Sequence, residues 1–261
     1  MNWGRVWAVC IRHLYVFRKN FDRLSDSFYW PVLDIILWGL TSAWVERSQI
    51  GVPHFILMLL TGLVYWQIVW RANYEISVNL LEEMWNANLV NLFSTPLKLS
   101  EWIAAAMLLG LLKLGVTILV GSGAVYLLYQ LNIFAVGYMT IPFFVILTIA
   151  GWTLGFIGAS FIIYWGQKVQ TIAWTMGFLL APFSAVYYPL DVLPTSVQAV
   201  SRWLPTTYVF EGMRFILATG TMPLEMLWKA TALTIFYLSL SIALFVFMFE
   251  KSRAKGLARL E

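Results

Sequence analysis

Charged residues are scarce in this sequence. Aspartate, glutamate, lysine and arginine make up 11% of its 261 residues, whereas apolar residues make up 61%. A soluble domain carries about a quarter charged residues, so this chain has too few charges to cover a surface that faces water. Its mean hydropathy of +0.76 agrees. We therefore expect lipid to surround much of the chain, and its length suits one integral membrane domain over residues 1–261.

Side chains suited to catalysis or metal binding are also few. The single cysteine, Cys10, excludes an intrachain disulfide framework and a cysteine metal cluster. The two histidines, His13 and His54, are not placed to activate a serine inside the membrane. The phosphate-binding pattern GxxxxGK[ST] does not occur, so the chain lacks the usual cradle for ATP. The sequence thus predicts no catalytic residues, no metal site and no cofactor in this chain.

Long apolar stretches are abundant. A helix that crosses a bilayer needs about 20 mostly apolar residues. Both termini lie on one side of the membrane if the number of spans is even, and Lys and Arg cluster at the two ends of the chain, which predicts cytoplasmic termini and a cytoplasmic tail over residues 250–261. We expect an all-α integral membrane protein with six spans, at residues 28–45, 54–73, 105–129, 138–164, 169–188 and 226–249.

The first 25 residues have a helical apolar pattern that includes Trp3, Val6, Cys10, Leu14 and Phe17. This spacing predicts an amphipathic helix over residues 1–25 that lies in the inner headgroup layer, where its arginines reach lipid phosphates. The alternative is a basic flank that only fixes the orientation of the first span.

Few ionisable residues fall inside the expected spans. Asp34, Arg71 and Lys113 all lie toward the cytoplasmic ends of their helices. A carboxylate in a membrane is a candidate for ion transport, and an ion-coupled carrier or a channel would use these three residues. The simpler interpretation is structural, with Asp34 paired to Arg71 and Lys113 near the membrane surface.

Small residues recur every four positions in two of the spans. This spacing lets helix backbones approach closely. It favours packing within one subunit, and a dimer face is the alternative. The residues are Gly151, Gly155 and Ala159 in one span, and Ala173, Gly177 and Ala181 in the next.

The expected cytoplasmic loop between the second and third spans contains EEMWNANLVNLFSTPLKLSEW, residues 82–102. Its apolar residues recur at helical spacing, and its glutamates and asparagines lie mostly on the other faces. We expect an amphipathic helix over residues 82–95, with Thr95 and Pro96 starting the next helix. Apolar knobs flanked by carboxylates suit a groove on a cytoplasmic partner.

A second polar interruption follows the fifth span, in YYPLDVLPTSVQAVSRWLPTTYVFEGMR, residues 187–214. Pro194 and Thr195 suit the start of a short helix and Pro205 suits its end. Glu211 and Arg214 are three residues apart, as in an ion pair on one helix face. We expect re-entrant short helices between the fifth and sixth spans. The alternative is a loop that only closes the outer surface.

Together these two segments resemble the coupling segment and the signature after the fifth span of ABC exporter permeases of the type 2 family. The resemblance covers the whole chain, with the N-terminal helix, six spans and a short basic tail. It implies a permease of the bacterial or archaeal cytoplasmic membrane in which two copies form the path. Two cytoplasmic ATP-binding subunits, which hold ATP and Mg²⁺, drive it, and its other contacts are with membrane lipids and not nucleic acid.

The resemblance also implies two functional segments. The coupling residues would be Glu82, Glu83, Met84, Trp85, Asn88, Leu89, Leu92 and Phe93. The exit segment would contain Pro189, Asp191, Pro194, Arg202, Pro205, Tyr208, Glu211 and Arg214. An amphipathic drug-like or lipid-like substrate is favoured, with a lipid-linked polysaccharide as the alternative, because Trp30 and Pro31 occur without the rest of the polysaccharide exporters' N-terminal pattern.

Overall fold

The computed structural model describes residues 1–21, 25, 28–47, 55–134 and 137–257, and within these residues it contains helices and no strands. In chain order they are α1 (Trp3–Lys19), α3 (Tyr29–Arg47), α4 (Phe55–Trp85), α5 (Leu89–Ser94), α6 (Leu99–Tyr129), η1 (Gly137–Thr140), α7 (Ile141–Trp165), η2 (Gly166–Val169), α8 (Ile172–Leu180), η3 (Ala181–Phe183), η4 (Leu190–Val192), α9 (Thr195–Ser201), α10 (Pro205–Thr219) and α11 (Leu224–Ala254).

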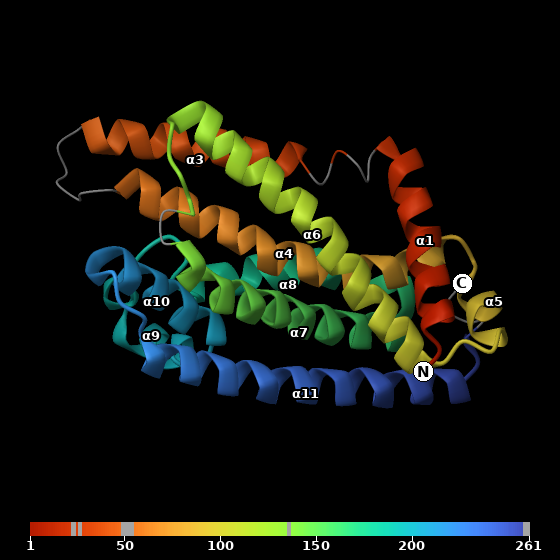
Figure 1. The fold of residues 1–261 in the computed structure, drawn as a ribbon. Coiled ribbons are helices and arrows are strands. Elements are labelled where there is room, and N and C mark those ends of the chain that lie inside the picture. The colour runs from red at the N-terminus through yellow and green to blue at the C-terminus, as the bar shows by residue number, and fades with distance from the viewer. Residues whose placement is uncertain (22–24, 26–27, 48–54, 135–136, 258–261) are drawn as a thin grey trace.

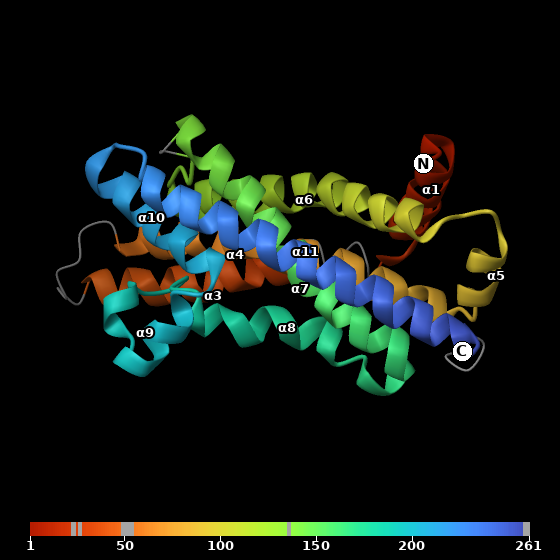
Figure 2. The ribbon, with the colours of Figure 1, turned by 90° about the horizontal axis from the view of Figure 1, so that it is seen from below.

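The long helices form one elongated bundle. Helices α4, α7 and α11 run side by side, and α6 crosses α4 at an angle (Figure 1). Helix α1 lies across one end of the bundle, where α5 and the C-terminal end of α11 are also found, and we call this the α5 end. Helices α9 and α10 lie at the other end, the α10 end (Figures 1 and 2).

Among the described residues, three helical segments are long and apolar enough to cross a membrane: Leu99–Tyr129, Gly137–Val169 and Leu224–Ala254. This is consistent with an integral membrane protein. The expected interfacial helix over residues 1–25 corresponds to α1, which ends at Lys19, and residues 22–24 lie outside the described part of the chain.

Helix α4 is central to the bundle and is longer than the sequence predicts. We expected a span that ends near residue 73, where polar side chains begin, but the helix continues to Trp85. The reason is that these polar side chains find partners inside the protein. Asn73 donates to the Ala173 carbonyl at 3.0 Å, and Ser77 donates to the Gly155 carbonyl at 3.0 Å. Buried polar groups with such partners do not end a helix.

The glycines of α7 let α4 pack against it at close range. A Cβ at Gly151 would lie 2.5 Å from the Val69 carbonyl oxygen, and one at Gly155 would lie 2.9 Å from the Asn73 carbonyl oxygen. Gly177 of α8 likewise faces the ring of Trp70. These small residues therefore serve helix packing within one chain, as expected from their spacing.

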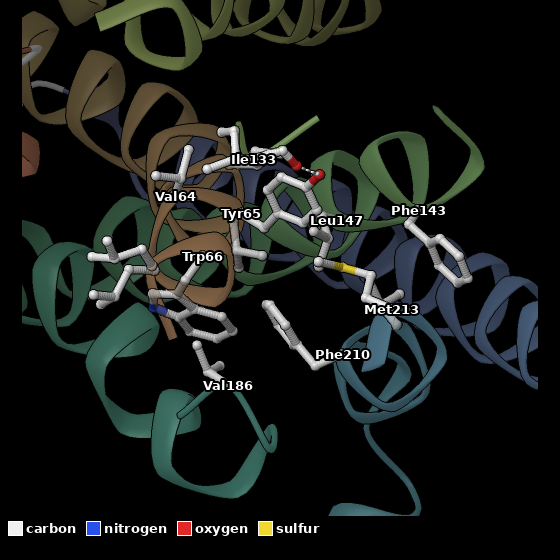
Figure 3. Packing of buried hydrophobic residues seen from close by; sticks show 14 of the residues in the cluster. Val64, Tyr65, Trp66, Ile133, Phe143, Leu147, Val186, Phe210 and Met213 are labelled. Atoms are coloured by element: carbon white, nitrogen blue, oxygen red, sulfur yellow. Dashed lines mark hydrogen bonds between the residues drawn. The ribbon is translucent and has the colours of Figure 1, made fainter. Parts of the chain in front are cut away.

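A hydrophobic core fills the α10 end of the bundle. Tyr65 of α4 is fully buried and its hydroxyl donates to the Ile133 carbonyl at 3.1 Å (Figure 3). Trp66 and Phe210 lie with ring centroids 6.1 Å apart, so α4 and α10 share this core.

Two further helix boundaries differ from those expected. Helix α6 starts at Leu99 rather than at Pro96, because the Glu101 carboxylate accepts the Lys98 backbone N–H at 3.0 Å and so caps the helix there. Helix α8 ends at Leu180, well before residue 188, because Pro182 removes a donor and crowds the preceding turn.

Candidate functional site

Helix α1 is joined to the end of α4 by ionic contacts. Arg12 forms an ion pair with Glu83, and the ring of His13 lies between two carboxylates, with Nδ1 3.6 Å from Glu82 and Nε2 3.3 Å from Glu83. His13 and Glu83 are buried. These contacts fix the position of α1 across the α5 end of the bundle.

A second ionic contact joins α1 to the start of α6. The backbone N–H of Asn2 donates to Glu101 at 2.7 Å, and the Arg5 guanidinium lies 3.5 Å from the same carboxylate. The carboxylate that caps α6 thus also holds the first turn of α1. A movement of α1 therefore acts on α4 and α6 together.

The buried face of α1 packs on α6. Val6 and Cys10 are fully buried against Ala105 and Leu109, and the Cys10 thiol donates to the Ala105 carbonyl at 3.4 Å. Burial raises the pKa of the Cys10 thiol above its ordinary value. Trp3 and Trp7 of the same helix are exposed, which leaves aromatic side chains available for a lipid headgroup layer.

The expected single helix over residues 82–95 is wrong, because the chain turns between α4 and α5. The N–H of Ala87 bonds to the Met84 carbonyl at 3.1 Å, and the N–H of Asn88 bonds to the Glu83 carbonyl at 2.8 Å. Ala87 has a φ of 47°, in the left-handed region. These bonds form a Schellman motif, which ends α4 and redirects the chain into α5.

Helix α5 is held against α4 and α11, and the end of α4 beside it contacts the turn before α8. The Asn88 side-chain amide donates to the Glu83 carboxylate at 2.7 Å, so one carboxylate contacts both α1 and the start of α5. Phe93 packs on Phe249 of α11 with ring centroids 4.8 Å apart. Trp85 donates to the Gln170 side chain at 3.2 Å, next to the turn before α8.

The region where α1, α4 and α5 meet has a polar pocket and, facing outward, a set of exposed residues. A pocket of about 320 Å³ lies between α1 and the turn before α5, and it is lined by Arg12, His13, Val16, Glu82, Glu83, Asn86 and Asn88. Facing outward from the turn and from α5 are Trp85, Asn86, Val90 and Asn91, all exposed. We call the exposed residues Trp85, Asn86, Val90, Asn91 and Ser94 the α5 surface.

The sequence-predicted coupling residues therefore divide into two groups. Trp85 is exposed, and Glu82, Asn88, Leu92 and Phe93 are partly buried. Glu83, Met84 and Leu89 are buried and connect helices within the chain. Val90 and Asn91 are exposed on α5 and were not among the predicted coupling residues.

A buried charge cluster joins α4 to α6 toward the α5 end of the bundle. Glu75 is fully buried, with Oε1 2.7 Å from the Arg71 guanidinium and Oε2 2.7 Å from the Lys113 ammonium. Phe17 of α1 lies over this cluster, with its ring centroid 4.8 Å from the Lys113 nitrogen. The expected pairing of Asp34 with Arg71 is wrong.

Asp34 instead accepts a hydrogen bond from Gln67 at 3.2 Å, and the carboxylate that binds Arg71 is Glu75. Sequence reasoning missed Glu75 because it lies beyond the expected end of the second span. Its position four residues after Arg71 was the available signal, since such residues face each other on a helix.

At the α10 end, Glu211 and Arg214 form the ion pair expected from their spacing, with nitrogen and oxygen 2.9 Å apart. Arg214 also donates to the backbone carbonyls of Ala185 and Tyr188, and Glu211 accepts the Leu190 N–H at 2.9 Å. The pair thus fastens the irregular segment after α8 to α10.

The other predicted exit residues lie in or next to η4, α9 and α10. Pro194 precedes the first turn of α9, and buried Pro205 occupies the first turn of α10. The Tyr208 hydroxyl donates to the Arg202 carbonyl at 2.9 Å, across the junction between these two helices. Pro189 precedes η4, whose Asp191 is exposed.

No group of three His, Cys, Asp or Glu side chains suited to a metal ion occurs in the described part of the chain. Comparison of the sequence with protein-family models finds no match, and comparison with curated proteins also finds none.

Proposed function

We propose that this chain is the transmembrane permease subunit of an ATP-driven ABC exporter of the type 2 family. Two copies form the path, and two cytoplasmic ATP-binding subunits drive it. All six segments expected from the sequence cross the cytoplasmic membrane, with both termini in the cytoplasm. The α5 end then faces the cytoplasm and the α10 end faces outward.

The observation that carries this proposal is the junction of α1, α4 and α5. Helix α5 stands at the end of the central helix of the bundle, and Glu83 contacts both α1 and Asn88. A subunit that presses on the α5 surface therefore displaces the end of α4 and, through Arg12, the position of α1. Such a junction suits the transmission of movement from a cytoplasmic partner into the bundle.

ATP hydrolysis belongs to the partner in this account. The chain has no GxxxxGK[ST] cradle, so ATP acts on it only through contact. The ATP-bound partner stabilises one packing of the helices and the nucleotide-free partner another, which is a population shift. Each packing exposes the path to one side of the membrane.

The segment from Pro189 to Arg214 would border the exit of the path. Irregular backbone at membrane depth persists where protein or a water-filled cavity shelters it. The Arg214 contacts to the Ala185 and Tyr188 carbonyls give part of this segment such shelter. The proposed substrate is an amphipathic drug-like or lipid-like molecule, and a lipid-linked polysaccharide is the alternative within the same class.

The Glu75 cluster favours a second candidate, an ion-coupled carrier. A buried carboxylate that contacts a lysine is a group that proton-driven carriers use, and Glu75 lies 2.7 Å from Lys113. In that case transport would follow an ion gradient and would need no ATP-binding partner.

Gentle affinity purification from native membranes separates the two candidates. The exporter proposal expects the tagged chain to co-purify with an ATP-binding subunit in equal amounts, in a complex with two copies of each. Recovery of the chain alone, with transport that survives ATP depletion, would contradict the exporter and favour the carrier.

A further inference from the structure

A cavity of about 220 Å³ lies inside the bundle toward the α10 end, and Pro205 is the one predicted site residue that lines it. Helices α4, α7, α8, α10 and α11 enclose it. Its lining residues are Trp66, Ala150, Thr153, Leu154, Ile157, Leu180, Leu204, Pro205, Thr206 and Tyr237.

The wall of this cavity is almost entirely apolar. Both threonine hydroxyls that line it are already used within the protein: Thr153 donates to the Ile149 carbonyl at 3.0 Å, and Thr206 donates to the Ser184 hydroxyl at 2.8 Å. A buried water needs two to four polar partners, and apolar cavities of about 150 Å³ stay dry and bind small hydrocarbons. The wall therefore favours an apolar ligand over water.

Rigid neighbours keep the cavity from collapsing. The indole of Trp66 packs in one cluster with Phe210 and Val186, as Figure 3 shows. Leu204 and Pro205 form the junction between α9 and α10, where the fixed φ of proline limits adjustment. An open volume of this size costs packing energy when empty, so a ligand that fills it stabilises the folded protein.

The side of the cavity near α8 and α11 faces the surroundings of the bundle. Leu180 and Tyr237 in its lining are partly exposed. The neighbouring residues Phe178, Phe236 and Leu240 are large, apolar and exposed. Because α11 is one of the helices long and apolar enough to cross a membrane, this side would border lipid.

We propose that this cavity binds a single hydrocarbon chain that enters between α8 and α11. The chain is either an acyl chain of a bilayer lipid or the apolar chain of an amphiphile that the protein transports, since the wall recognises only the chemistry they share. This inference depends on insertion of the protein in a membrane, as proposed above, and does not depend on the ATP-binding partner.

Photolabelling in liposomes tests the proposal. The full-length protein is reconstituted with phosphatidylcholine that carries a diazirine at the end of one acyl chain. A second sample receives an alkyl maltoside with a diazirine at the end of its chain. Mass spectrometry then locates the adducts. We expect adducts on the peptides that contain Leu154 and Leu204, in addition to adducts at exposed Leu240.

Two cavity-filling variants and one control make the result specific. Ala150→Leu and Ile157→Phe add carbon atoms to the lining, whereas Val145→Phe adds them on the exposed face of the same helix. Adducts at Leu154 and Leu204 are expected to be lost in whichever filling variant elutes as a single folded species, and to persist in Val145→Phe.

Each outcome decides the matter. Cavity labelling by phosphatidylcholine assigns a bilayer lipid, and labelling by the alkyl maltoside alone assigns a single-chain amphiphile. Labelling at Leu240 without labelling at Leu154 or Leu204 overturns the cavity site while leaving membrane insertion intact. Cavity adducts that persist unchanged in both filling variants also overturn it.

Discussion

The side-chain amide of Asn88 donates a hydrogen bond of 2.7 Å to the carboxylate of Glu83, across the turn that separates α4 from α5. The same carboxylate pairs with Arg12 of α1. One buried side chain of α4 thus contacts both α1 and the residue that precedes α5, and its carboxylate makes both contacts.

Charge reversal at Glu83 is expected to destabilise the fold rather than only weaken the contact with a partner. Glu83→Lys would place a second cation against Arg12 inside the protein, and removal of one partner from a buried pair costs about 3 kcal/mol or more. Thermal unfolding of the solubilised protein measures this. Glu250→Lys, at an exposed position near the same end of the bundle, serves as the control. Equal unfolding temperatures for the two variants would contradict the assigned role.

The single cysteine reports whether α1 stays attached. Cys10 is fully buried against α6, so a maleimide should react slowly with the native chain. Arg12→Ala removes the ion pair to Glu83 and is expected to increase the labelling rate, whereas Arg18→Ala, at an exposed position of the same helix, should leave it unchanged. Similar rates in all three proteins would show that the ion pair does not hold α1.

The pH dependence of this labelling has a defined sign. Burial raises the pKa of the Cys10 thiol, so less of the reactive thiolate is present near pH 8 than for a free cysteine. The rate in the native protein should therefore continue to rise above pH 9. In Arg12→Ala, release of α1 lowers the pKa toward its ordinary value and shifts the rise to lower pH. A native profile that levels off near pH 9 would contradict the burial.

Substitution of Glu75 separates structure from ion coupling. In Glu75→Gln a neutral amide faces Arg71 and Lys113. Loss of one partner from a buried ion pair lowers the free energy of unfolding by about 3 kcal/mol, so the unfolding temperature should fall by several degrees. Lys113→Met retains the contact between Glu75 and Arg71 and should lower the unfolding temperature less.

The same two variants test ion coupling. For the exporter, transport by either variant depends on ATP and not on a proton gradient. Loss of proton-driven uptake in Glu75→Gln alone would favour the carrier.

The contact between α4 and α7 depends on the absence of a side chain at Gly151. Gly151→Ala places a Cβ 2.5 Å from the Val69 carbonyl oxygen, which forces the helices apart at a cost of about 1–3 kcal/mol. Gly123→Ala on α6 meets no atom within 4 Å and should be neutral or slightly stabilising. Unfolding temperatures of the two alanine variants give the comparison, and a loss of stability at Gly123 equal to that at Gly151 would contradict the packing.

Local features of the structure were predictable from the sequence, and contacts between distant segments were not. The helix after Pro194 and the pair of Glu211 with Arg214 depend on neighbouring residues, so spacing was enough to identify them. The buried position of Glu83 depends on α1, which lies about 70 residues earlier in the chain, and periodicity carries no information on such contacts.

Helix α4 illustrates the same limit. Its polar second half lies beyond residue 73, where the second span was expected to end, and it includes Glu75 and Ser77. They are buried against α6 and α7, where Lys113 and the Gly155 carbonyl bind them. The sequence therefore identified which residues are polar, and only the packing of the other helices shows why they remain helical.

Crosslinking from α5 tests the proposed function most directly. A photoreactive amino acid replaces Val90, on the α5 surface, or Val200, which is exposed on α9 at the other end of the bundle, and native membranes are irradiated. We expect an adduct between position 90 and an ATP-binding subunit, and no such adduct from position 200. Absence of an ATP-binding subunit from the adducts of position 90, in protein that still transports its substrate, would contradict the exporter proposal.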